Sequence, residues 1–170
     1  MYSTKINLKD EVRQKIIELF QERLSDGLDL MLQTKHAHWN LKGEQFISLH
    51  RLCDKVNKAM RKSSDLIAER IVQLGGVAHG TSQSITKKTS IDEYPSNIAD
   101  WKEHIEFLSN SLAQFCNESR AALKQFDKID DPVSEDILIE VTRKVDMYLW
   151  MLESHLFRAK AGEQDLSEVA

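Results

Sequence analysis

The sequence predicts an all-α protein folded as a four-helix bundle, and three observations support this class. Glycine and proline supply only 6 and 2 of the 170 residues, whereas average usage of the two would be about 12%. Apolar side chains recur at spacings of three and four, the period of amphipathic helices. Hydrophobic residues make up 41% of the chain and the charges are mixed in sign. This composition disfavours a disordered chain, and the scarcity of turn residues disfavours a β sandwich or barrel.

The first two helices are expected from about Leu8 to Thr34 and from the residue after Gly43 to Leu74. The apolar seam of the first consists of Leu8, Val12, Ile16, Phe20, Leu24, Leu28 and Met31. That of the second consists of Phe46, Leu49, Cys53, Val56, Met60, Ile67 and Leu74. Two glycines at 75–76 provide a C-terminal stop.

A Ser-, Thr- and Lys-rich connection covers residues 77–95, and a connection this long suggests a small element of its own. The segment 90–93 resembles a cap followed by a short turn of helix. The third helix follows with the seam Ile98, Trp101, Ile105, Leu108, Leu112 and Phe115. The fourth follows Pro132, with Ser134 as the expected N-cap, and ends near Phe157.

Two helix pairs joined by one long crossover have the connectivity of ferritin-like bundles. Residues 1–170 are therefore expected to form a single domain, with a short N-terminal tail over 1–7 and a loose C-terminal tail over 159–170. Two cysteines are too few for a disulfide framework, and the sequence contains no signal-peptide core and no apolar run long enough for a membrane span. We therefore expect a soluble cytoplasmic protein.

Residues able to bind a metal gather in one region of the sequence: His36, His38, His50, Asp54, Asp65 and Glu69. Two of the pairs, His50/Asp54 and Asp65/Glu69, have the i, i+4 spacing that places both members on one helix face. Imidazole with carboxylate suits iron, manganese or zinc. All four side chains also fall off the apolar seam, so a simple solvated face is the alternative interpretation.

The spacing of the two pairs limits how they could share an ion. Asp54 and Asp65 are 11 residues apart, which separates them by ~16 Å along a helix. One chain cannot bring both pairs to the same ion, but two antiparallel copies of the helix can. No Glu stands three residues before any of the six histidines, which disfavours an intrachain Glu-x-x-His di-iron core.

The metal-capable residues belong to a longer pattern. It runs His38-Trp39-Asn40-Leu41-Lys42-Gly43, then Phe46, Leu49-His50 and Asp54, then Asp65, Ala68-Glu69-Arg70-Ile71 and Leu74-Gly75-Gly76. Tyr94-Pro95 and Leu149-Trp150 extend the similarity over most of the chain. This pattern resembles the Dps family of mini-ferritins.

The resemblance implies a ferritin-like homo-dodecamer, hollow, with ferroxidase centres at two-fold interfaces and two irons per centre. One subunit would supply His38, His50 and Asp54, and its partner Asp65 and Glu69. Trp39 would be a neighbour of the site and not a ligand. The implied reaction oxidises iron(II), preferentially with hydrogen peroxide, and stores the ferric mineral inside, protecting the cell from oxidative damage. No haem is expected, because the five methionines form no stripe.

Four acidic residues mark the start of the fourth helix: Asp130, Asp131, Glu135 and Asp136. The family places an acidic three-fold pore for iron uptake there, whereas ordinary compensation of the helix dipole is the alternative. His36 and His79 match no family ligand and are expected to be solvated.

DNA binding in the family is attributed to Lys-rich tails that meet the phosphate backbone. Here the N-terminal tail carries only Lys5 and Lys9, and the C-terminal tail sets Arg158 and Lys160 against Glu163, Asp165 and Glu168. With a net charge of −4 per chain, strong DNA binding is doubtful. Two alternatives stay open: a nucleoid-compacting DNA binder with secondary ferroxidase activity, and a structural cage with an inactive site.

Overall fold

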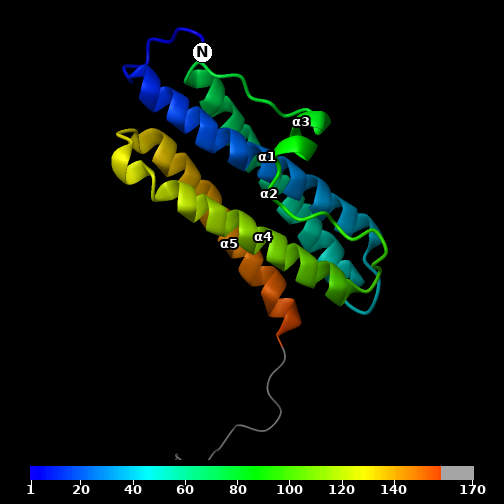
Figure 1. Cartoon of the computed structure of the whole chain (residues 1–170). Coiled ribbons are helices and arrows are strands. Elements are labelled where there is room, and N and C mark those ends of the chain that lie inside the picture. Colours follow the sequence, from blue (N-terminus) through cyan, green and yellow to red (C-terminus); the bar gives the residue numbers. More distant parts are fainter. Residues whose placement is uncertain (158–170) are drawn as a thin grey trace, which may run out of the picture.

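The computed structural model describes residues 1–157, and this part of the chain is a bundle of four long helices with a short fifth one on its side (Figure 1). In chain order the helices are α1 (Asp10–Asn40), α2 (Phe46–Gln73), α3 (Ser82–Lys88), α4 (Trp101–Leu123) and α5 (Pro132–Leu156), with a 3₁₀ turn at Phe126–Lys128. Hairpins α1–α2 and α4–α5 pack together, and a long crossover joins them. The predicted all-α bundle is confirmed. None of its helices is long and apolar enough to cross a membrane.

Helix α1 ends six residues later than the sequence predicts, because no glycine or proline interrupts the chain between Gly27 and Gly43. The extra turns continue the buried face, with Thr34 and Ala37 fully buried. His36, His38 and Trp39 therefore lie on a helix and not in a connection. Within α1, Gly27 allows a close helix approach, since a Cβ there would lie 2.8 Å from the Ser64 hydroxyl of α2.

The short helix of the crossover is α3, and the predicted position for it at 90–93 is wrong. Helix α3 begins at Ser82, where the Thr81 side chain caps it by accepting a hydrogen bond from the Ser84 N–H. Ser90 serves a different purpose, because its N–H and its hydroxyl both donate to the buried Asp26 carboxylate, at 2.7 and 3.1 Å. The crossover is thus fixed to α1 by a side chain far away in the sequence.

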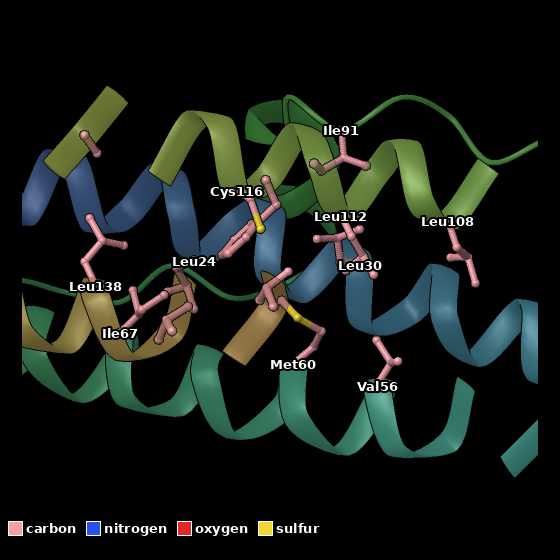
Figure 2. Packing of buried hydrophobic residues seen from close by; sticks show 14 of the residues in the cluster. Leu24, Leu30, Val56, Met60, Ile67, Ile91, Leu108, Leu112, Cys116 and Leu138 are labelled. Atoms are coloured by element: carbon pink, nitrogen blue, oxygen red, sulfur yellow. The ribbon is translucent and has the colours of Figure 1, made fainter. Parts of the chain in front are cut away.

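The core forms where the apolar seams of the four long helices meet, as Figure 2 shows for Leu24, Met60, Leu112 and Leu138. The predicted seams hold along most of their length, with exceptions at two helix starts. Phe46 is 38% exposed at the first residue of α2. Ile98 precedes α4, which begins at Trp101. The predicted loose tail over 159–170 lies outside the described residues.

A buried polar cluster joins the end of α2 to the start of α5. Arg70 donates from Nε to the Ser134 hydroxyl and from Nη2 to the Asp131 carboxylate, both at 2.8 Å, and Ser134 donates to the same carboxylate. The N-cap position is occupied by Asp131, with Pro132 first in the helix. The prediction of Ser134 as the N-cap is therefore wrong, because its hydroxyl is held by Arg70 and Asp131.

We expect Arg70→Ala to lower the free energy of unfolding by about 3–5 kcal/mol, because it leaves the buried Asp131 carboxylate without its counter-charge. Arg143→Ala, on the exposed side of α5, is the matched control and should change it by less than about 0.5 kcal/mol. Urea denaturation of the two variants measures the difference. Equal losses in both would show that the cluster does not stabilise the bundle.

Candidate metal site

Two histidines meet where α1 ends and α2 begins. The short connection 41–45 reverses the chain. Gly43 adopts a φ of +123° there, a backbone conformation that residues with a Cβ rarely take. The His38 and His50 rings stack with their centroids 3.7 Å apart and their planes 21° apart. Each ring bonds through Nδ1 to the main-chain carbonyl of the other residue, at 2.8 Å in both cases.

These reciprocal bonds determine which ring nitrogen could bind a metal. A carbonyl oxygen only accepts, so Nδ1 carries the proton in both His38 and His50. A neutral ring bonded this way keeps its lone pair on Nε2, and a backbone carbonyl on Nδ1–H is the usual second partner of a metal-ligating histidine. Both rings are half-buried. The pair therefore presents two oriented nitrogen ligands.

Asp54 lies one helical turn after His50 and is held by two lysines. Lys58 Nζ is 2.7 Å from one carboxylate oxygen, and Lys35 Nζ is 3.1 Å from the other. Hydrogen bonds from Lys58 and then Lys35 lower the pKa of Asp54 to about 2. The carboxylate is therefore ionised at neutral pH, and an arriving cation would have to displace the ammonium groups. The sequence prediction included Asp54 but missed both lysines, although Lys58 stands at i+4.

Asp65 and Glu69 are exposed on α2, further along the same helix. The structure does not bring them to the histidine pair, as the 11-residue spacing predicted. In the described part of one chain, no three His, Cys, Asp or Glu side chains gather closely enough to hold a metal ion. Neither Asp65 nor Glu69 forms an ion pair with a described residue of its own chain.

Trp39 is next to His38 in sequence and is 68% exposed. The Lys35 ammonium lies 6.0 Å from the centre of its ring. Since Lys35 also contacts Asp54, the Trp39 indole lies near the Lys35–Asp54 ion pair. His36 is half-buried and not fully solvated, with its ring 5.0 Å from that of Tyr94.

The four acidic residues at the start of α5 have different surroundings. Asp131 is only 4% exposed and is paired with Arg70. Asp130 and Asp136 are exposed, and Glu135 is half-buried. Of these four, Asp130, Glu135 and Asp136 therefore have accessible carboxylates in the single chain, and a role in a pore stays a prediction.

The two helix hairpins, the long crossover between them and the metal-capable side chains on α1 and α2 define a ferritin-like protein. Comparisons with known proteins agree with this class. The family model described as a ferritin-like domain matches residues 17–161. The DNA protection during starvation protein of Agrobacterium fabrum is 37% identical over 155 residues, covering 91% of this chain and 96% of that protein.

Two solved structures are similar over nearly their whole length. A Mycobacterium smegmatis Dps has a TM-score of 0.89 at 30% identity, covering 94% of this chain and 96% of its own. DpsA14 from Streptomyces coelicolor has a TM-score of 0.87 at 34% identity, covering 93% of each chain. The chain belongs to the Dps family of ferritin-like proteins. Membership in this family supports a role in iron storage and protection.

We expect Lys58→Met to strengthen the binding of zinc(II), a redox-inert probe, because an ammonium group that competes for Asp54 is removed. Exposed ion pairs are weak, so we expect a gain in affinity of at most several-fold. Isothermal titration of the assembled protein measures it. Lys15→Met, an exposed lysine of α1 far from the proposed ligands in sequence, is the control, and an equal gain there would contradict the competition.

Proposed function

We propose that this protein oxidises iron(II) at centres shared between two subunits, preferentially with hydrogen peroxide, and stores the ferric product inside a hollow dodecamer. The observation that carries the proposal is the His38–His50 pair, whose Nδ1 bonds to backbone carbonyls leave Nε2 as the nitrogen able to bind a metal, with the ionised Asp54 one helical turn after His50. Two imidazoles and a carboxylate are a donor set suited to iron.

A partner subunit is needed because each chain carries two separated halves of a site. Helix α2 holds His50/Asp54 and Asp65/Glu69 about 20° apart around its axis, at a separation of ~16 Å. When two such helices lie antiparallel about a two-fold axis, the first half of one faces the second half of the other. Each isologous interface would then contain two equivalent sites, each with five ligands: His38, His50 and Asp54 from one chain, Asp65 and Glu69 from its partner.

Two irons per centre match the chemistry of the oxidant. Hydrogen peroxide needs two electrons for complete reduction to hydroxide, and each iron(II) supplies one. Reaction at a pair therefore avoids release of a hydroxyl radical. Three carboxylates lower the positive charge of the site and favour the iron(III) product, while the neutral histidines select a transition metal.

Iron would reach the interior through a three-fold pore lined by the acidic residues at the start of α5. In the single chain Asp130, Glu135 and Asp136 have accessible carboxylates, and these would attract iron(II). Asp131 would take part indirectly, because its ion pair with Arg70 fixes the start of α5.

Binding of DNA through the N-terminal tail is disfavoured by how that tail is held. Tyr2 donates its N–H to the Gly75 carbonyl at 2.6 Å, and Arg13 lies close to the Tyr2 carbonyl, at 3.4 Å. The same Arg13 donates to Leu74 at 3.1 Å and pairs with Asp10 at 2.6 Å. A segment fastened to the end of α2 cannot extend along a phosphate backbone, so we assign DNA binding at most a minor role.

Replacing the second half of the site tests the proposed function. We expect Asp65→Asn/Glu69→Gln to lower the initial rate of iron(II) oxidation by hydrogen peroxide at least about tenfold, because a loss of about 1.4 kcal/mol in stabilisation already gives that factor. The rate is followed as ferric absorbance after anaerobic loading with iron(II).

The matched control is Glu18→Gln/Glu22→Gln, a pair of exposed acids with the same spacing on α1. It removes the same charge and should oxidise iron like the unmodified protein. Equal rates in all three proteins would refute the proposed site.

A further inference from the structure

A groove between α2 and α5 gathers positive charge from both helices. It has a volume of about 500 Å³, and the basic residues of its lining are Lys55, Lys58, Lys62 and Lys144. The first three are spaced three and four residues apart on α2, so they lie on one face of that helix, and the fourth comes from α5. All four side chains are exposed. A small ion in solution can therefore reach them in the single chain.

The acids of the groove do not neutralise these lysines. Its lining contains two carboxylates, Asp65 and Glu140. Within residues 1–157, neither acid forms an ion pair with a lysine of the groove, and Lys58 alone among the four lysines has a partner, Asp54. The groove therefore holds ammonium groups in excess over carboxylates.

The chemistry of the lining suits a small oxyanion. Lysine binds phosphate as a compact positive charge, and its flexible stem lets three N–H donors turn toward the ligand. Four ammonium groups against two carboxylates leave two positive charges, which a phosphate dianion would balance. A cavity of this volume takes one phosphate with part of its hydration shell.

Lys58 belongs both to this groove and to the proposed metal site. Its Nζ lies 2.7 Å from a carboxylate oxygen of Asp54, one helical turn earlier, and its side chain is 73% exposed. A metal at Asp54 has to displace this ammonium group. The other lysine at Asp54, Lys35, lies on α1 and is not part of the groove lining. Only Lys58 can therefore carry a charge from the metal site to the groove.

We propose that this groove binds a phosphate ion, and that the phosphate and a metal at Asp54 strengthen each other's binding through Lys58. The inference rests on the proposed function, because it takes Asp54 as a metal ligand. Without phosphate, the metal breaks the Lys58–Asp54 ion pair and leaves the ammonium without a counter-ion. With phosphate in the groove, the ammonium turns to the anion, so the metal meets less competition.

The coupling is reciprocal by thermodynamic necessity. Phosphate raises the affinity for the metal by the same factor by which the metal raises the affinity for phosphate. Exposed ion pairs are weak, so we expect a factor of about two to five. Salt screens exposed charges over a Debye length of about 8 Å at physiological ionic strength, so the factor should fall as sodium chloride is added. The proposed centre would then bind iron(II) most readily when phosphate is plentiful.

Equilibrium dialysis with radiolabelled inorganic phosphate tests the groove in the metal-free, assembled protein. We expect Lys55→Gln/Lys62→Gln/Lys144→Gln to weaken phosphate binding at least about tenfold, because three charged donors are lost. The matched control is Lys15→Gln/Lys124→Gln/Lys128→Gln, which removes the same charge from another groove, between the start of α1 and the turn after α4. Equal weakening in both variants would show a response to total charge alone and would overturn the groove site.

Isothermal titration with zinc(II) at several phosphate concentrations tests the coupling. We expect phosphate to raise the zinc affinity of the unmodified protein about two- to fivefold relative to that of Lys58→Met at the same phosphate concentration. The comparison with Lys58→Met removes the effect of zinc–phosphate association in solution, which is the same for both proteins. The Lys15/Lys124/Lys128 control should keep the full gain.

Two results would overturn the inference even if phosphate binds: the same phosphate dependence in the unmodified protein and in Lys58→Met, or displacement of the phosphate by a short DNA duplex, which would assign the groove to nucleic acid. Asp54→Asn separates these failures from a failure of the proposed function. Zinc binding that is weaker in Asp54→Asn but shows no coupling through Lys58 contradicts only the inference. Zinc binding unchanged in Asp54→Asn contradicts the proposed metal site itself.

Discussion

The reciprocal hydrogen bonds between His38 and His50 are the interaction on which the proposed site depends. They join the last turn of α1 to the beginning of α2, and each ring is oriented by the backbone carbonyl of the other histidine. The same two bonds leave both Nε2 atoms available as ligands. Gly43 makes the arrangement attainable by reversing the chain, and a Cβ there would lie 2.6 Å from the Trp101 ring. The same two hydrogen bonds therefore fix the end of α1 against the start of α2 and orient the two proposed histidine ligands.

The continuity of α2 then determines what one chain can and cannot do. An uninterrupted helix from Phe46 to Gln73 keeps Asp65 and Glu69 at a fixed distance from the histidine pair. In the proposed function each chain would supply parts of two sites and complete neither alone, so the proposed activity would depend on assembly. The Arg70–Asp131–Ser134 cluster supports the far end of this helix by fastening it to α5.

The sequence predicted what depends on local periodicity and missed what depends on contacts between distant residues. Apolar spacing predicted the four long helices, which the structure confirms, and i, i+4 spacing predicted the two residue pairs of the proposed site, which stay a prediction. The position of α3 was wrong because Asp26, sixty-four residues before Ser90, captures that residue. Asp131 was predicted to be one of four accessible acids at the start of the fourth helix. Its partner Arg70 lies on another helix, so the spacing of residues along the sequence does not reveal the ion pair.

Mixing two inactive variants tests the central claim, a site shared between chains, most directly. His38→Asn/His50→Asn keeps a side-chain donor for each carbonyl but removes both Nε2 ligands, and Asp65→Asn/Glu69→Gln removes the other half. When the two are dissociated and assembled together, half of the interfaces should pair unlike chains. One of the two sites in each is then intact, so about a quarter of the unmodified activity should return. Activity no higher than the average of the two variants would contradict a shared site.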